Sequence, residues 1–373
     1  MRYLQLEECC EILDSLRIPI TASDRKAGPY PYYGANGIQD YVADYIFDDE
    51  LVLLAEDGGN FGSKTRPIAY RASGKFWVNN HAHVLKPKRN IVNVDYLCYS
   101  LMFYNTEELV NGATRQKLTQ AAMRKMLIPE QPIQVQKKIV AELKTIQAII
   151  SARQQQLQKL DELVKARFVE LFGTLHNNGN GFDVVTIADV CSLIKDGTHQ
   201  TPQYTDNKET GYKFLSSKDV MSQKIDWTDI KYIPAELHEK LYATIKPQRN
   251  DILMSKNGVN YGIAAVNDTD EVFDIYVSLA LLRPKELIAP VFLRCAINNP
   301  ETKRQFDSSI KGIGVPNLHL GEIKKTKIFL PPMELQKEFV SFVEQTDKSR
   351  AAVQKALDEA QLLFDSLMQK YFG

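Results

Sequence analysis

Two short glycine segments carry side chains whose types and spacing suit contact with a polyanion. The first reads LLAEDGGNFG at 53–62, and the second reads LMSKNGVNYG at 253–262. Glycine loops let backbone N–H groups approach phosphates, while Arg, Lys and Asn side chains reach base edges in a DNA groove. The candidate contact residues near the first segment are Lys64, Arg66, Arg115 and Lys117, and those near the second are Lys256, Asn257, Asn260 and Lys311.

Two Gly/Pro-anchored segments, which we expect to be loops, add aromatic and amide groups. They read GPYPYYGANGI at 28–38 and DGTHQTPQYT at 196–205. Amide side chains pair with adenine, and hydroxyl groups pair with several bases. Each composition is also typical of ordinary turns. The candidate groove contacts in these segments are Tyr32, Asn36, His199 and Gln200.

The sequence lacks the common catalytic motifs. KGIGVPN at 311–317 keeps only part of a phosphate-loop pattern, with Pro316 where a helix would start. HExxH, GxSxG and CxxC are absent, as is the Asn/Asp-Pro-Pro-aromatic tetrapeptide of amino-methylating enzymes. A nuclease-like group is approached by Glu56, Asp57 and Lys64, but the second glycine segment has Lys and Asn in place of the two acids. We therefore expect no catalytic residues.

A metal site is the other chemical possibility. His81 and His83, two positions apart in an expected strand, would point to one face, as metal ligands can. Zinc sites need three or four ligands, and no third ligand is apparent. We therefore interpret the pair as a half-buried strand face beside Trp77 and expect no metal.

The charges are balanced overall and segregated locally. The 373 residues contain 46 Lys plus Arg and 46 Asp plus Glu. The formal net charge is therefore zero, and no global basic field indicates a nucleic-acid or membrane partner. Acids without bases occupy 40–57, whereas bases without acids occupy 64–89. Such runs are usually solvated surface, but basic segments beside both glycine segments favour a binding face.

Cysteine usage and hydropathy indicate the compartment. The five cysteines form no CxxC pair, which suits a reducing compartment better than a disulfide framework. The N-terminal MRYLQLEECCEILDSL carries acids and lacks the apolar core of a signal peptide, and no window resembles a membrane span. We expect a soluble cytoplasmic protein with no membrane partner.

An internal repeat organises the chain. Residues 118–173 align with 318–373 without a gap, at an offset of 200, and the offset also relates the two glycine segments. Each copy begins with short apolar runs between Gly, Pro and Asn, typical of a mixed α/β module, and continues into a Pro- and Gly-free helical stretch. The predicted boundaries are 1–130 for the first module, 131–173 for the first helix, 174–331 for the second module and 332–373 for the second helix.

Both helical stretches carry heptad seams. Apolar residues recur at spacings of three and four, which predicts that each helix has a partner helix. The simplest arrangement is an antiparallel coiled coil about 60 Å long with a module at each end and a pseudo-twofold axis. The expected fold class is therefore α+β, with two mixed α/β modules separated by two long helices. The candidate seam residues are Leu143, Ile150, Leu157 and Leu160 in the first helix, and Val343, Val353, Leu357 and Phe364 in the second.

These features together resemble the specificity (S) subunits of type I restriction-modification systems, and the resemblance covers the whole chain. It rests on PYYGANG, on DGTHQTP, on GATRQKLTQAAMRKMLIPEQPIQVQKKIV and on its second copy GVPNLHLGEIKKTKIFLPPMELQKEFV. The most specific element is the Ile-Pro-x-x-Pro-x-x-x-Gln pattern that leads into a long helix. The second copy departs from it, because Phe329 stands where the first copy has Pro129, and Pro331 directly precedes Pro332.

The resemblance implies a phage-defence protein that reads DNA and has no catalysis of its own. Each module would be a target recognition domain for one half of a bipartite, asymmetric DNA site, and the helices would set the gap between the halves. Two adenine methyltransferase (M) subunits would dock on the helices, and restriction (R) subunits would join where the system has them. S-adenosylmethionine, ATP and Mg would belong to those partners, with no cofactor in this chain.

A different interpretation stays open at the level of sequence. A duplicated coiled-coil scaffold whose modules bind protein or carbohydrate ligands would explain the repeat and the helices equally well. The neutral net charge favours this alternative slightly, whereas the paired basic, glycine-containing segments favour DNA.

Overall fold

The computed structural model describes residues 2–112, 115–310 and 316–373. The chain divides into two compact units. Unit 1 comprises Met1–Gln155 together with Gln354–Gly373, and unit 2 comprises Gln156–Val353. Each unit has its own sheets and its own hydrophobic cores.

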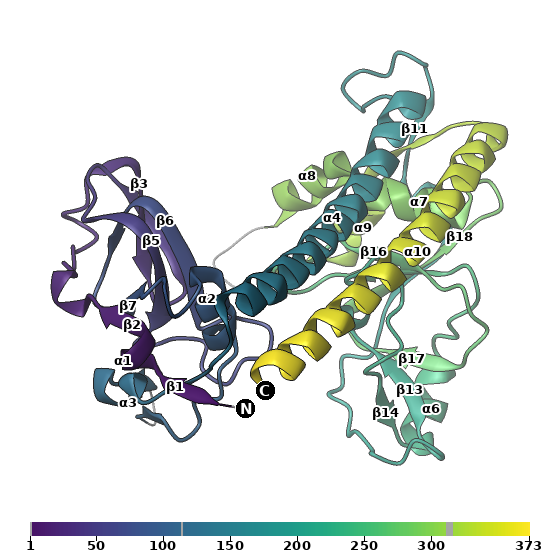
Figure 1. The fold of residues 1–373 in the computed structure, drawn as a ribbon. Coiled ribbons are helices and arrows are strands. Elements are labelled where there is room, and N and C mark those ends of the chain that lie inside the picture. Colours follow the sequence, from purple (N-terminus) through teal and green to yellow (C-terminus); the bar gives the residue numbers. More distant parts are fainter. Residues whose placement is uncertain (1, 113–114, 311–315) are drawn as a thin grey trace. The chain divides into compact units, whose positions relative to one another are not determined.

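A six-stranded sheet forms the centre of unit 1 (Figure 1). Strand β5 (Phe47–Ala55) lies inside this sheet, and its apolar run at 51–55 is fully buried. One face of the sheet packs on helix α2 (Val94–Met102), and the other forms a smaller core around Phe76. In sheet order the strands are β2 (Cys10–Ile12), β7 (Ala82–Pro87), β5, β6 (Ala69–Val78), β3 (Ala27–Gly34) and β4 (Gly37–Val42).

Smaller elements complete unit 1. Strand β1 (Tyr3–Gln5) pairs antiparallel with β10 (Leu127–Pro129), so segments far apart in sequence meet just before the first long helix. The remaining elements are α1 (Leu6–Cys9), a 3-10 turn at Asp14–Leu16, β8 (Val110–Asn111), β9 (Lys117–Leu118) and α3 (Gln120–Arg124).

The composition of 28–38 predicts a loop, yet most of this segment is strand. β3 and β4 form a hairpin in which Gly34 pairs with Gly37, and Gly37 has a φ of 105°, a conformation that suits glycine. Tyr32 lies in β3 and is 1% exposed, with its hydroxyl 3.1 Å from the backbone nitrogen of Ile20. Because Tyr32 is a core residue, the prediction that it contacts a DNA groove is wrong.

Unit 2 contains a four-stranded and a three-stranded sheet, and β11 (Asp183–Thr186) pairs with β19 (Lys327–Leu330) as β1 pairs with β10. The four-stranded sheet has the order β12 (Cys191–Asp196), β18 (Leu279–Pro284), β15 (Ile252–Ser255) and β16 (Ala264–Val266). The three-stranded sheet has the order β14 (Lys231–Ile233), β13 (Tyr212–Leu215) and β17 (Phe273–Ile275). The shorter helices are α5 (Ile187–Val190), a 3-10 turn at Ser217–Val220, α6 (Ala235–Tyr242), α7 (Pro290–Ile297), α8 (Pro300–Ser309) and α9 (Leu320–Lys325).

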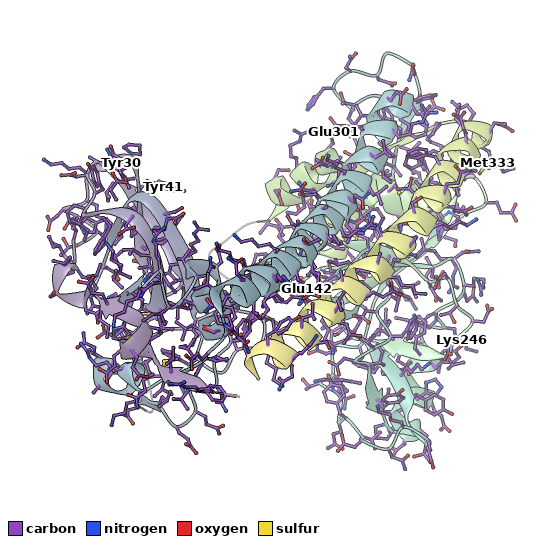
Figure 2. The ribbon with its side chains drawn as sticks, viewed as in Figure 1. Tyr30, Tyr41, Glu142, Lys246, Glu301 and Met333 are labelled. Carbon is purple, nitrogen blue, oxygen red and sulfur yellow. The ribbon has the colours of Figure 1, made fainter. Side chains whose placement is uncertain are left out.

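The two heptad stretches form the helices α4 (Ile133–Phe172) and α10 (Met333–Phe372). Helix α10, drawn in yellow, begins at the labelled Met333 (Figure 2). The absence of Pro and Gly allows 40 residues of unbroken helix in each case. Among the described residues, no helix has the length and apolar character needed to cross a membrane.

Ion pairs join the two long helices within unit 2. Arg167 of α4 pairs with Glu338 of α10 at 2.8 Å, and Asp161 of α4 pairs with Arg350 of α10. Residue numbers therefore fall along α4 in the direction in which they rise along α10. The two helical segments run antiparallel within this unit.

The seam residues also belong to the cores of the modules. Leu143 of α4 and Phe364 of α10 share one core with α2, and Val343 lies in the main core of unit 2. These helix ends therefore also pack into the cores of the modules. Coiled-coil pairing along the full length stays a prediction. Partly buried seam residues are Ile150, Leu157, Leu160, Val353 and Leu357.

Candidate nucleic-acid interface

The first glycine segment leaves strand β5 at a backbone junction centred on Glu56. The Glu56 N–H donates to the carbonyl of His81 at 2.9 Å, and its carbonyl accepts from the N–H of Leu118 at 2.7 Å. Gly58 then donates to the carbonyl of Gln116 at 3.2 Å. These bonds bring three loops of unit 1 together, although the loops are far apart in sequence.

The second glycine segment leaves strand β15 at the same kind of junction. The Lys256 N–H donates to the carbonyl of Ser278 at 2.9 Å, and its carbonyl accepts from the N–H of Leu318 at 2.9 Å. Gly258 donates to the carbonyl of Pro316 at 3.0 Å. Glu56 and Leu118 thus correspond to Lys256 and Leu318 at an offset of 200, so the sequence repeat is present in the backbone geometry of both units.

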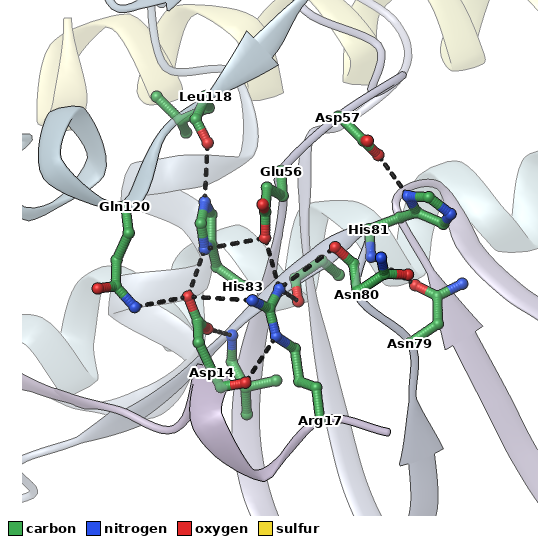
Figure 3. Close-up of polar contacts among 12 residues, drawn as sticks. Asp14, Arg17, Glu56, Asp57, Asn79, Asn80, His81, His83, Leu118 and Gln120 are labelled. Atoms are coloured by element: carbon green, nitrogen blue, oxygen red, sulfur yellow. Dashed lines mark hydrogen bonds and ion pairs between the residues drawn. The ribbon is translucent and has the colours of Figure 1, made fainter. Parts of the chain in front are cut away.

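Charged side chains fill the space beneath the junction of unit 1 (Figure 3). Glu56 lies between Arg17, at 2.6 Å, and Lys117, at 3.1 Å. His83 lies deeper, with Nδ1 2.6 Å from Asp14 and Nε2 2.9 Å from the Leu118 carbonyl. Both ring nitrogens lie within hydrogen-bond distance of an oxygen atom, so the ring of His83 is held at both ends.

The acids of this cluster are held in their charged form. Burial disfavours ionisation of Asp14, but hydrogen bonding and attraction to His83 outweigh it and keep the pKa of Asp14 below its usual value. Burial acts in the same way on Glu56, and hydrogen bonds from Arg17 and Lys117 reverse it, so the pKa of Glu56 is also lowered. The cluster is therefore a network of compensating charges.

The same cluster offers a set of possible metal ligands that sequence reasoning missed. Ligand atoms of Asp14, Glu56 and His83 lie within 4.8 Å of one another. The Arg17 guanidinium already supplies positive charge to both acids, and Gln120 donates to Asp14 at 3.0 Å. Because these groups already compensate the carboxylates, we assign no metal to this cluster.

The histidine pair differs from the sequence interpretation. His83 is 1% exposed and belongs to β7, whereas His81 precedes the strand and bonds to Asp57 at 2.5 Å. The prediction of a shared, half-buried face beside Trp77 is therefore wrong. Asp14, the partner of His83, lies 69 residues away, and no local pattern in the sequence connects the two.

The cationic candidates of unit 1 fall into two groups. Lys64 and Arg66 are exposed on the loop after the first glycine segment, and the Ser63 hydroxyl accepts from the Arg66 N–H at 2.9 Å. Arg115 is 60% exposed but pairs with Asp57 at 3.1 Å, and Lys117 pairs with Glu56 as described above. Of these four candidates, the two without a carboxylate partner among the described residues therefore lie on the loop at 63–66.

Asn36 connects the hairpin turn to the same region. Its amide donates to the carbonyl of Gly58 at 3.0 Å, and its side chain is exposed. One of its two N–H donors is used by this bond, while the other donor and the amide oxygen remain geometrically available. Asn36 is therefore placed beside the glycine segment, as a candidate contact should be.

The candidates of unit 2 are placed less uniformly. His199 and Gln200 are exposed beyond strand β12, and Asn260 is exposed in the second glycine segment. Asn257 is partly buried, and its side-chain oxygen has no hydrogen-bond partner among the described residues. Lys311 lies outside the described residues.

The structure corrects the expectation that Lys256 is an exposed contact residue. It is 4% exposed, and its ammonium group bonds to Asp196. A buried lysine already paired with a carboxylate cannot reach a phosphate without breaking that pair, so the prediction that Lys256 contacts DNA is wrong for this structure. Sequence reasoning overlooked Asp196, although it opens the segment DGTHQTP that had been singled out.

The sequence model described as "Type I restriction modification DNA specificity domain" matches residues 1–162 and 180–361, which is nearly the whole chain. The chain belongs to this specificity family. The doubled junction agrees with the two matched ranges, because each range contains one glycine segment and one junction.

Related members of the specificity family support the assignment. A Haemophilus influenzae protein described as a type I restriction enzyme specificity subunit is 40% identical over 146 residues, 39% of this chain and 37% of that protein. A type I specificity subunit of Mycoplasma pneumoniae is 21% identical over 91% of this chain and 88% of its own length. The crystal structure of a type I restriction-modification S subunit from M. genitalium has the same fold, with a TM-score of 0.61 at 14% identity, over 100% of this chain and 96% of that one.

Within this member of the specificity family, the two junctions carry opposite charges at equivalent positions. Glu56 is the acid of its ion pairs, whereas Lys256 is the base of its pair with Asp196. The backbone scaffold is thus shared while the side chains differ. Such divergence is expected where two modules of common architecture recognise different chemical groups.

Proposed function

We propose that this chain is the sequence-reading subunit of a type I restriction-modification enzyme. It binds a bipartite, asymmetric DNA target, with one half-site for each module, and directs adenine methyltransferase subunits to that target. The observation that carries this proposal is the repeated backbone junction, which presents two similar glycine segments with different side chains. A DNA reader specific for two unlike half-sites needs this combination of shared scaffold and divergent contacts.

The proposed contacts divide by chemistry. In unit 1, the exposed Lys64 and Arg66 meet phosphates or base edges, and Asn36 presents its free amide groups beside them. In unit 2, the proposed contacts are the exposed side chains of His199, Gln200 and Asn260. Because the formal net charge of the chain is zero, we expect a modest nonspecific phosphate contribution from this chain alone, and partners supply much of the nonspecific affinity.

The long helices serve as the spacer and as the dock for partners in this proposal. Two methyltransferase subunits bind along α4 and α10, and restriction subunits join in systems that contain them. The proposed antiparallel coiled coil gives the gap between half-sites a constant length. S-adenosylmethionine, ATP and Mg act in the partner subunits, and this chain takes no part in a chemical step.

The proposal is tested by exchanging one module. Residues 1–117 are replaced by the matching module of a relative with another specificity, the chain is combined with its methyltransferase subunit, and methylated adenines are mapped on genomic DNA. One half of the methylated motif should change, while the other half and the gap stay the same. A change in both halves, or in the gap alone, would contradict the assignment of one module to one half-site.

A control distinguishes the reader from an enzyme. The isolated chain, incubated with DNA and labelled S-adenosylmethionine, should transfer no label, and transfer should begin when the methyltransferase subunit is added. Label transfer by the isolated chain would show that the chemistry resides here. If the methyltransferase methylated the same DNA motif with and without this chain, a scaffold role would be favoured instead.

A further inference from the structure

A charged cavity of about 270 Å³ lies in unit 2, where α4, α10 and α7 meet the turn at 221–224. It is separate from both glycine junctions. Among the described residues, its lining includes four cationic side chains and two carboxylates. The charged residues are Lys165, Lys224, Arg294, Arg350, Asp161 and Asp347.

The two carboxylates are already engaged by other cations of the lining. Asp161 pairs with Arg350, and Asp347 lies 3.5 Å from Lys224 and 3.9 Å from Arg350. The lining therefore keeps an excess of positive charge after these pairs are formed. Such an excess in a partly enclosed cavity favours an anionic occupant.

Arg294 is the most buried cation of the lining, and its carboxylate partner is distant. Its side chain is 10% exposed, and its guanidinium lies 4.0 Å from Asp347 and 3.4 Å from the carbonyl of Gln223. A further contact joins it to the sulfur of Cys295 at 3.6 Å, and its Nε has no hydrogen-bond partner among the described residues. A guanidinium with five donors normally satisfies more of them when it is buried.

The corresponding place in unit 1 is filled. The backbone N–H groups that open α2 and α7, of Asn93 and Ala289, occupy equivalent positions, and six residues further on lie Tyr99 and Cys295. The Tyr99 hydroxyl donates to Gln147 at 2.6 Å, and its ring contacts Phe364. The smaller Cys295 leaves space in unit 2.

The side chains that line the cavity in unit 2 also differ in charge from their counterparts in unit 1. The repeat relates Asp347 and Arg350 to Gln147 and Ile150, and it relates Val164 to the bulky Phe364. At these three positions unit 1 has neutral side chains, whereas unit 2 has two charged residues and a smaller apolar one.

We propose that this cavity is a socket for a carboxylate side chain of a methyltransferase subunit. The inference rests on the proposed function, and it adds a specific chemical contact to that docking. A planar carboxylate matches the two terminal amino groups of a guanidinium. The adjacent Asp161 and Asp347 would repel the double charge of a phosphate group more strongly than the single charge of a carboxylate.

The test uses Arg294→Met in the full-length chain, titrated with the methyltransferase subunit of the same system. Arg294→Met keeps the stem and removes the charge, so Kd should rise at least tenfold, and Arg294→Lys should restore part of the loss. Arg304→Met is the matched control, because Arg304 is an exposed arginine of the same unit that pairs only loosely with Glu301. The control should bind as the wild type does.

A second measurement does not depend on the folding of a variant. Excess acetate, compared with chloride at equal ionic strength, should weaken the wild-type complex and leave the Arg294→Met complex unaffected. If Arg294→Met bound the methyltransferase like the wild type and acetate had no specific effect, the socket would be refuted while the proposed function stood. If the wild-type chain failed to bind the methyltransferase at all, both proposals would fail.

Discussion

Gln136 and Gln336 make the same three hydrogen bonds in the two units. Each is buried in the first turn of a long helix, and each accepts from the backbone N–H of the N-cap residue of an earlier helix of its module, α2 or α7, at 2.7 and 2.8 Å. Their amide nitrogens donate to two carbonyls each, namely Ile91 and Gln131 in unit 1 and Leu287 and Pro331 in unit 2. These contacts explain why both copies of the repeat carry Gln at this position.

Loss of either glutamine should loosen its own unit. Gln136→Ala and Gln336→Ala each leave a buried N–H and two carbonyls without their partner, which should cost about 2 to 3 kcal/mol. Amide hydrogen exchange at Asn93 and Ala289 reports on the two units separately, and each variant should lose protection at one of them. Gln134→Ala, at an exposed position, is the control. Loss of protection at both sites from one substitution would contradict the prediction that each glutamine stabilises only its own unit.

The ion pair of Lys256 should matter for stability and for one half-site. Lys256→Met leaves Asp196, whose side chain is 20% exposed, without its cation, and we expect a loss of about 2 kcal/mol. Because Asp196 lies next to the exposed His199 and Gln200, the reading of one half-site should also relax. Thermal unfolding and methylation mapping test this, with the exposed Lys324→Met as control. Unchanged stability with uniformly weaker DNA binding would restore Lys256 as a phosphate contact.

Exposed and paired arginines of unit 1 should behave differently. Arg66→Ala removes an exposed cation and should weaken DNA binding of the assembled complex by about 1 to 3 kcal/mol if Arg66 reads a base. Arg115→Ala removes a cation already paired with Asp57, so its effect should be smaller. Binding measured over a series of salt concentrations distinguishes the roles, because loss of a phosphate contact lowers the salt slope by about one. Equal effects of both substitutions would contradict this order.

Acid should destabilise unit 1 through Asp14. The pKa of Asp14 is lowered in the folded protein, so its stabilising contribution is present above the unfolded value of about 4 and is lost as pH falls through the lower folded value. Asp14→Asn should be less stable at neutral pH by about 2 kcal/mol. Its free energy of unfolding should also fall less steeply than that of the wild type as the pH is lowered. Trp77 fluorescence in a Trp227→Phe background follows the unfolding of unit 1. If the free energy of unfolding fell equally steeply with pH in the parent and in Asp14→Asn, this role of Asp14 would be contradicted.

Several features of this protein follow from the sequence because they depend on local or repeated patterns. Heptad spacing without Pro or Gly predicts both long helices, since helical hydrogen bonds join residues four positions apart. The short apolar runs between Gly, Pro and Asn predict mixed α/β modules, and the run at 51–55 is the buried part of strand β5. The offset of 200 relates the two junctions, because copies of one sequence fold into copies of one backbone.

Tertiary structure alone decided which polar residues face solvent. Tyr32 and Lys256 look like surface contacts in sequence, yet each is buried by segments distant along the chain. Asp14 becomes a partner of His83 only because β7 and the turn after β2 lie side by side. Burial and charge pairing depend on neighbours in space, and a local sequence pattern carries no information on residues that approach from elsewhere in the fold.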